Sequence, residues 1–105
     1  MDGTPDAMLE EMTRRIAERF DPEKVILFGS RARGDSRPDS DYDLLVVFSA
    51  CLDKRQRAVA VRKLLSDLGV SKDILVATSA EIGSEKPGAI VRSALNEGRT
   101  VYERA

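Results

Sequence analysis

Three short apolar runs constrain the fold of this chain more than any other feature of its sequence. They lie within the segments KVILFGS (24–30), DYDLLVVF (41–48) and KDILVAT (72–78). Runs of this length, rich in Val, Ile and Leu, are typical of β-strands that are covered on both faces. The sequence therefore predicts three strands within a packed domain, and either a short extended tail or an edge strand at RTVYE (99–103).

Segments with helical periodicity flank and separate these strands. The first helix is predicted to begin with Thr4 as its N-cap and Pro5 in its first turn, and to end at Asp21-Pro22. Its apolar residues recur every four positions: Met8, Met12, Ile16 and Phe20. Further helices are predicted over 53–68 and 84–96.

The order of these elements predicts the topology of the sheet. Because the helix 53–68 connects the second strand to the third, these two strands form a βαβ unit and pair in parallel. The connection between the first two strands is short and holds at most one helical turn, which fits antiparallel pairing. A length of 105 residues suits a single domain over 1–105. The expected fold class is α/β, with a small mixed β-sheet flanked by helices.

Composition narrows the chemistry that the chain can carry out. With 17 basic and 18 acidic residues it has no basic excess that would indicate nucleic-acid binding. It has one cysteine, no apolar stretch that could span a membrane and no secretory pattern, so we expect a cytoplasmic protein. It has no histidine, which excludes Ser-His-Asp and Cys-His catalysis. Chemistry must use carboxylates, hydroxyls, cations or a hard metal ion.

Acidic residues and a Gly-Ser turn are expected to meet at one edge of this sheet. Asp41 and Asp43 lie two positions apart in a strand and so point to the same side. Asp73 begins the parallel third strand, which brings it to the same end of the sheet. The first strand ends at Gly29-Ser30, beside that end if its pairing is antiparallel. The sequence therefore predicts one cluster from segments that are far apart in the chain.

This cluster has the chemistry of a site for phosphate and magnesium. Neighbouring carboxylates repel each other unless a cation lies between them, and Mg²⁺ prefers carboxylate, water and phosphate oxygens. Gly29 allows the backbone to approach a phosphate closely, and Ser30 can donate a hydrogen bond to it. The arginines Arg31, Arg33 and Arg37 could neutralise a triphosphate or pyrophosphate. Alternatively, these arginines form surface pairs with nearby aspartates, which contribute little to stability.

The segment GSRARGDSRPDSDYDLLV (29–46) resembles the motif of the DNA polymerase beta-like nucleotidyltransferase superfamily, in which Gly-Ser is followed by Asp-x-Asp and by a third aspartate on a later strand. Within it, the chain is most similar to the minimal nucleotidyltransferases, also called MNT or MntA-like domains. The resemblance extends over nearly the whole chain, including DILVAT (73–78) and ALNEGRTVYE (94–103). It implies the nucleotidyltransferase fold.

The resemblance also implies roles for the clustered residues. Gly29 and Ser30 would bind the nucleoside triphosphate, and Arg31 and Arg33, from their charge, are the arginines that we expect to contact it. Asp41 and Asp43 would ligate two Mg²⁺ ions, and Asp73 would complete the metal site or act as the base. The implied reaction transfers AMP from ATP to a hydroxyl group. Members of this group often modify a tyrosine of a helical HEPN-domain toxin and so act as its antitoxin.

Two other motifs are approximated here but fail at a required residue. The segment 29–36 has the two glycines of a P-loop, but Asp35 stands where the phosphate-binding lysine is needed. The aspartates from Asp39 onward imitate the start of an EF-hand loop, but Leu44 replaces its glycine and Ala50 its closing glutamate. We therefore exclude both.

A second functional class stays open at this stage. The chain could be a binding module, an antitoxin that neutralises its partner by occlusion without catalysis. No carboxylate that the catalytic mechanism requires is missing, which favours the enzyme. The sequence does not define the acceptor, the preference for ATP over other nucleotides, or whether the chain forms a homo-oligomer.

Overall fold

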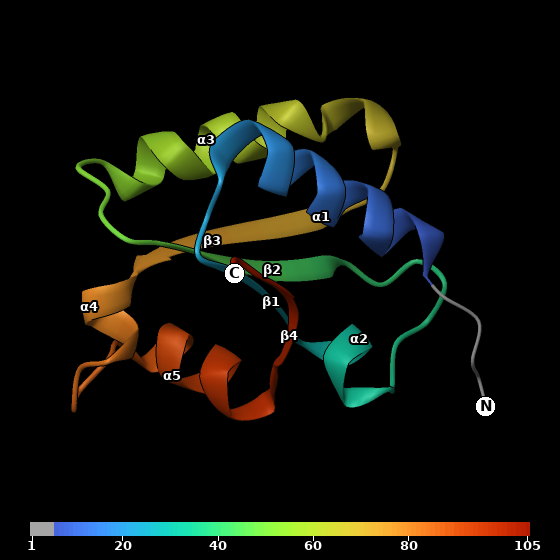
Figure 1. Ribbon diagram of the computed structural model, residues 1–105. Coiled ribbons are helices and arrows are strands. Elements are labelled where there is room, and N and C mark those ends of the chain that lie inside the picture. The colour runs from blue at the N-terminus through green and yellow to red at the C-terminus, as the bar shows by residue number, and fades with distance from the viewer. Residues whose placement is uncertain (1–5) are drawn as a thin grey trace.

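The computed structural model describes residues 6–105 and shows an α/β fold (Figure 1). The elements follow one another in the order α1 (Ala7–Phe20), β1 (Lys24–Phe28), α2 (Ser30–Arg33), β2 (Tyr42–Phe48), α3 (Lys54–Leu64), the 3₁₀ turn η1 (Ser66–Leu68), β3 (Lys72–Thr78), α4 (Ser79–Ile82), α5 (Ala89–Glu97) and β4 (Arg99–Glu103).

The four strands form one mixed sheet in the order β3-β2-β1-β4. β2 and β3 are parallel, as the helical connection between them predicts, and β1 is antiparallel to both β2 and β4. The predicted edge strand is thus confirmed as β4, whose register against β1 shifts between Val25 and Ile26. The predicted mixed sheet is also confirmed.

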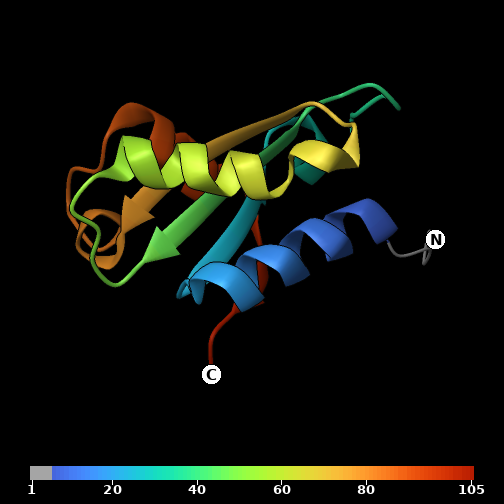
Figure 2. The same cartoon turned by 90° about the horizontal axis from the view of Figure 1, so that it is seen from above.

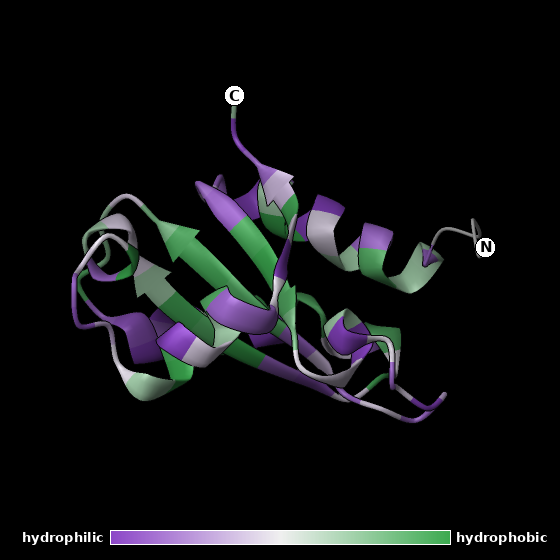
Figure 3. Ribbon diagram, turned by 90° about the horizontal axis from the view of Figure 1, so that it is seen from below, coloured by the Kyte–Doolittle hydropathy of each residue, from purple (hydrophilic) through white to green (hydrophobic). Residues whose placement is uncertain are grey.

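Helices cover both faces of the sheet, so the central strands are buried on both sides. α1 and α3 lie side by side on one face, and α4 and α5 lie on the other (Figures 1 and 2). Because side chains alternate along a strand, Leu44 and Val46 join the core under α1 and α3, whereas Leu45 and Val47 join the core under α5. Figure 3 shows the central strands as hydrophobic along most of their length, while the helices mix both kinds of residue.

The first helix begins later than predicted. Its N-cap is Asp6, whose carboxylate accepts a hydrogen bond from the Leu9 N–H at 3.0 Å. The predicted Thr4 cap and Pro5 lie outside the described residues. The predicted end is confirmed, because Asp21 adopts a left-handed conformation with φ 49° and its N–H bonds to the carbonyl of Ala17.

The predicted helix 53–68 is interrupted at Leu65. Asp53 is its N-cap, and α3 ends at Leu64 before the short turn η1. Leu65 is fully buried, with φ −102° and ψ 5°, and its N–H bonds to the carbonyl of Arg62. The Ser66 hydroxyl also donates to the Lys63 carbonyl at 2.9 Å. This local hydrogen bond competes with the helical pattern and tightens the last turn.

The predicted helix 84–96 was wrong in its first turn. α5 begins only at Ala89, because Pro87 disfavours helical geometry at Lys86 and Gly88 follows it. The prediction also missed α4, a single turn with a capping box at its start. The strands β1 and β2 are shorter than predicted: β1 ends at Phe28 and β2 begins after Asp41.

Across residues 6–105, every helix is too short or too polar to cross a lipid bilayer.

Candidate active site

The register of the strands brings the predicted acidic residues and the Gly-Ser turn to one edge of the sheet. Asp43 pairs with Asp73 across the parallel strands β2 and β3, and with Phe28 across the antiparallel strands β1 and β2. Gly29 therefore follows β1 directly beside Asp43, and Asp41 precedes β2 by one residue. We refer to Asp41, Asp43 and Asp73 together as the acidic edge.

The sides on which these residues point also agree with the strand periodicity. Tyr42 is buried in the core under α1 and α3. Asp43 is the next residue along the strand and points to the opposite side, as does Leu45, which lies in the core under α5. The side chain of Asp43 is half-buried. The carboxylate of Asp43 thus lies on the face of the sheet that carries α5.

Glycine is the residue type that fits at position 29, directly after β1. Its φ is +75°, a conformation that other residues rarely adopt. A Cβ atom built at this position would collide with the carboxylate of Asp43. The backbone of the turn and the carboxylate of Asp43 are therefore in direct contact.

The carboxylates of the acidic edge have no direct side-chain partner within the part of the chain that the structure describes. Among residues 6–105, no hydrogen bond or ion pair reaches a side-chain oxygen of Asp41, Asp43 or Asp73. Partial burial raises the pKa of Asp43, and repulsion from Asp73 and then Asp41 raises it further. Arg33 opposes this shift in pKa, and Glu97 adds to it. Such a site favours a ligand that brings positive charge.

The donor set of the acidic edge fits Mg²⁺. Carboxylate oxygens are hard ligands, and Mg²⁺ commonly binds one or two of them together with water and substrate phosphates. Within residues 6–105, no three His, Cys, Asp or Glu side chains, the acidic edge included, lie together as a group that could hold a metal ion. An open site of two carboxylates that shares its ion with a nucleotide is consistent with both observations.

Arg31 is held by the loop between α2 and β2. Its guanidinium donates to the carbonyl of Ser40 at 3.0 and 3.1 Å and to that of Pro38 at 3.2 Å. It also stacks over the ring of Tyr42, 3.9 Å from the centroid. The Tyr42 hydroxyl donates to the carboxylate of Asp6, the N-cap of α1. Arg31 therefore links the loop to the core, and its contact with nucleotide stays a prediction.

Arg33 lies closer to the acidic edge and is half-exposed. It pairs with Asp35 at 3.4 Å and with Glu97 at 3.3 Å. These pairs raise the pKa of Arg33, and the hydrogen bond that its guanidinium donates to Asp35 contributes most. Arg37 is exposed in the loop, where its N–H donates to the Ser40 hydroxyl. The nucleotide-binding roles of Ser30, Arg31 and Arg33 remain predictions.

The sequence did not indicate Glu97 as part of this site. Its carboxylate accepts a hydrogen bond from the N–H of Gly29 at 3.1 Å, although the two residues are 68 positions apart. No spacing rule connects a glutamate at the end of a helix with a turn so distant in the chain. The structure alone brings them together, by packing α5 on β1.

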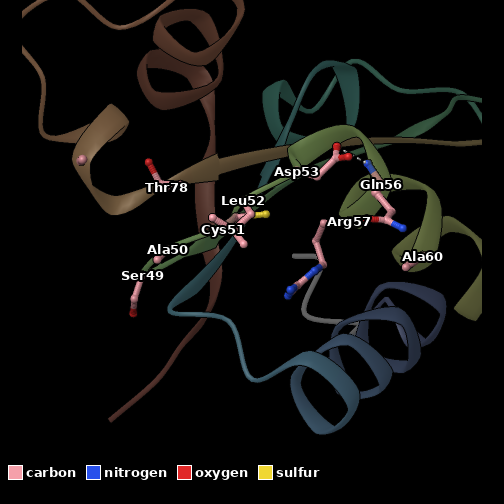
Figure 4. Close-up of a pocket in the computed structure, with 10 residues that line it drawn as sticks. Ser49, Ala50, Cys51, Leu52, Asp53, Gln56, Arg57, Ala60 and Thr78 are labelled. Atoms are coloured by element: carbon pink, nitrogen blue, oxygen red, sulfur yellow. Dashed lines mark hydrogen bonds between the residues drawn. The ribbon is translucent and has the colours of Figure 1, made fainter.

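An open cavity of about 810 Å³ lies at the other end of β2 and β3, away from the acidic edge (Figure 4). It is bordered by Cys51, Leu52, Arg57 and Thr78. Figure 4 shows these side chains spread around the hollow, with Asp53 capping α3 through the N–H of Gln56. Asp53 and Thr78 cap helices there, and the guanidinium of Arg57 lies over the ring of Phe48 at 4.7 Å from the centroid. We place the chemistry at the acidic edge instead, where several carboxylates lie at one end of the sheet.

Comparison with known proteins agrees with the fold and the motif. The sequence profile of the nucleotidyltransferase domain family matches residues 9–101. The chain therefore belongs to this family, and its activity is that of a nucleotidyltransferase.

Two curated relatives are named as enzymes that adenylylate proteins. One, from Methanocaldococcus jannaschii, bears the provisional name of a protein adenylyltransferase; it is 35% identical over 83 residues, which are 75% of this chain and 77% of the relative. The other is the protein adenylyltransferase MntA of Thermococcus cleftensis, 28% identical over 81 residues, which are 77% of this chain and 82% of the relative.

Solved structures share the fold at low sequence identity. A crystal structure of a toxin–antitoxin complex with AMP-PNP matches with a TM-score of 0.69 and 18% identity, over 90% of this chain and 73% of that one. A complex of the tri-AMPylated HEPN toxin of Shewanella oneidensis with its MNT antitoxin matches with a TM-score of 0.63 and 15% identity, over 93% and 71% of the two chains. These matches establish the nucleotidyltransferase fold.

Proposed function

We propose that this chain transfers AMP from ATP, with Mg²⁺, to a tyrosine or another hydroxyl of a HEPN-domain partner protein, as the antitoxin of that partner. The observation that carries the proposal is the register of Asp43, which pairs with Asp73 on one side and adjoins the Gly29 turn on the other. The names of the curated relatives and the toxin–antitoxin complexes among the structural neighbours support the choice of a protein acceptor.

In this proposal the acidic edge would hold the cation and the Gly29 turn would bind the triphosphate. Asp41 and Asp43 would hold Mg²⁺, which would neutralise the phosphate charge and polarise the α-phosphate of the nucleotide. The turn after Gly29, with the hydroxyl of Ser30 and the guanidinium of Arg33, binds the triphosphate. Repulsion among the carboxylates makes ATP binding weak unless the cation is present.

The group transfer is a single displacement at the α-phosphorus. The acceptor oxygen attacks this phosphorus, and the bond from the α-phosphorus to the oxygen bridging to the β-phosphate breaks. Pyrophosphate leaves with the electron pair, while AMP remains on the acceptor oxygen. The resemblance implies two roles for Asp73, and we propose that it takes the proton of the hydroxyl. Its side chain is exposed, so a hydroxyl presented from outside the sheet can reach it.

The test is intact-mass spectrometry of the HEPN-domain protein after co-expression with this chain. We expect the partner to be heavier by one or more AMP units, and to lose this added mass when Asp41 and Asp43 are both replaced by Asn. Asp39→Asn is the matched control, because this aspartate is exposed in the same loop and is not part of the acidic edge. A partner that is neutralised without any added mass would instead identify the chain as a binding module that acts by occlusion.

A further inference from the structure

Glu97 reaches the candidate active site because α5 ends directly against β1. The residue that follows it, Gly98, closes the helix with an N–H bond to the Ala94 carbonyl at 2.8 Å. A Cβ atom at this position would lie 2.6 Å from a side-chain carbon of Ile26 and 2.9 Å from the carbonyl oxygen of Leu27. Only glycine permits this close approach, which sets the last residue of α5 beside the end of β1.

The carboxylate of Glu97 has two partners in the site. It accepts a hydrogen bond from the N–H of Gly29 at 3.1 Å, and it pairs with the guanidinium of Arg33 at 3.3 Å. Gly29 is buried, so its N–H would lose its hydrogen-bond partner without this carboxylate. The pair with Arg33 is more exposed and therefore contributes less.

The bond from Gly29 to Glu97 is important because glycine has no side chain that could hold the turn. The carbonyl of Gly29 accepts hydrogen bonds from the N–H groups of Ala32 and Arg33 at 3.1 and 3.0 Å, which fixes one side of the residue. Glu97 fixes the other side. The conformation it maintains has a positive φ and lies in contact with the carboxylate of Asp43.

We propose that Glu97 is a positioning residue of the nucleotidyltransferase site: it ties the end of α5 to the Gly29 turn, so that the turn is already in place when the nucleotide binds. This inference rests on the proposed function, in which the same turn binds the triphosphate. Glu97 acts through the backbone of Gly29, and its pairing with Arg33 is secondary.

Two substitutions separate the hydrogen bond from the charge. Glu97→Gln keeps an oxygen that can accept from the Gly29 N–H but removes the negative charge, whereas Glu97→Ala removes both. If the hydrogen bond positions the turn, the Gln variant behaves like the wild type and the Ala variant does not. If only the charge is important, the two variants behave alike.

The experiment measures the turn and the nucleotide separately. Amide hydrogen exchange by NMR reports on Gly29 without nucleotide, and calorimetry gives the Kd of AMP-PNP with Mg²⁺. For Glu97→Ala we expect exchange at Gly29 to accelerate about tenfold or more and the Kd to rise roughly three- to tenfold, the range for one lost hydrogen bond. For Glu97→Gln we expect both values within about twofold of the wild type. Glu85→Ala, an exposed glutamate before α5, controls for the loss of charge.

Either of two results would overturn the proposal: unchanged exchange at Gly29 in Glu97→Ala, or equal losses in the Ala and Gln variants. Should Glu97→Ala fail to fold, Glu97→Asp replaces it with the same expected losses, because the shorter side chain withdraws the carboxylate from Gly29. Exchange at Gly29 needs neither nucleotide nor partner. A wild-type chain that transfers no AMP would therefore contradict the proposed function and leave the exchange result standing.

Discussion

At the two ends of the β2–β3 pair, the pKa values of nearby carboxylates are shifted in opposite directions. At the end away from the site, the Glu23 carboxylate accepts a hydrogen bond from the Ser49 hydroxyl, and Glu81 pairs with Lys54 at 2.7 Å. These contacts lower the pKa of both glutamates. At the acidic edge, burial and neighbouring carboxylates raise the pKa of Asp43 instead. The same sheet thus stabilises ionised carboxylates at one end and destabilises one at the other.

This difference indicates which end performs chemistry. A carboxylate that serves the fold is normally paired, because an unpaired charge in a partly buried place costs free energy. The acidic edge retains that cost, which a bound cation can remove. The opposite end has a hollow (Figure 4), but the carboxylates of Glu23 and Glu81 there have hydrogen-bond partners and do not carry this cost. In this chain, charge therefore favours the acidic edge as the candidate site, whereas cavity volume favours the opposite end.

The largest expected effect is the loss of activity in Asp43→Asn. If Asp43 is a metal ligand, as we propose, its removal should cost several kcal/mol of transition-state stabilisation, which corresponds to a loss of about a thousandfold or more in the rate of AMP transfer. Glu81→Gln is the control, because it removes the same charge at the other end of the sheet and should leave the rate within about twofold. A rate for Asp43→Asn near that of the wild type would contradict the assignment of the metal site.

The next largest effect is expected on stability, for Gly29→Ala. The added Cβ meets an unfavourable positive φ and collides with Asp43, so the free energy of unfolding should fall by roughly 3 kcal/mol. Gly69→Ala is the matched control: its φ is +71°, but nothing lies within 4 Å of the added atom. Strain alone should then cost roughly 1 kcal/mol.

Urea denaturation gives both free energies of unfolding. A double substitution of Gly29 and Asp43 by Ala removes the collision and should recover most of the difference between the two glycine positions. Equal losses at Gly29 and Gly69 would mean that the turn and the acidic edge are not in contact.

A smaller effect is expected from Thr78→Ala at the opposite end. Thr78 caps α4, its side-chain oxygen accepting from the N–H of Glu81 at 3.3 Å while Glu81 bonds back to the Thr78 N–H at 3.0 Å. Losing this capping box should lower the free energy of unfolding by about 1 kcal/mol. AMP transfer should stay within about twofold of the wild type. A large loss of activity would mean that this end of the sheet also belongs to the site.

The sheet was predictable from the sequence because its signals are local and strong. The apolar runs of β1 and β2 read directly as buried strands, and the helical connection from Phe48 to Lys72 required parallel pairing. The placement of Asp43 and Asp73 at the same end of the sheet follows from that pairing, and the structure adds their register. Their juxtaposition is confirmed, whereas their chemical roles stay proposals.

What the sequence could not provide depends on contacts between distant segments. α5 begins later than its periodicity suggested, because the local effects of Pro87 and Gly88 outweigh it. Glu97 belongs to the site only because Gly98 allows close packing on β1. Arg31 carries the charge expected of a phosphate ligand, yet its guanidinium bonds to carbonyls of its own loop. These are properties of packing, for which no residue spacing is diagnostic.

The smallest expected effect is a difference in the sign of pH dependence between the two ends. The folded state raises the pKa of Asp43, so this group's contribution to stability is fully present below the ordinary aspartate pKa and is lost as pH rises through the raised value. Asp43→Asn should therefore gain stability relative to the wild type over that window, by at most about 1 kcal/mol because solvent screens a partly exposed group.

Glu81 should behave in the opposite way, since pairing with Lys54 lowers its pKa in the folded state. Its contribution is present above the ordinary glutamate pKa and is lost as pH falls through the lowered value. Glu81→Gln should therefore be less stable than the wild type at neutral pH, by no more than about 0.5 kcal/mol for such an exposed pair, and equal to it in acid. Urea denaturation across this pH range should give difference curves of opposite slope for the two variants. Curves of the same slope would mean that Asp43 is compensated within the chain, which would remove the electrostatic reason for a cation at the acidic edge.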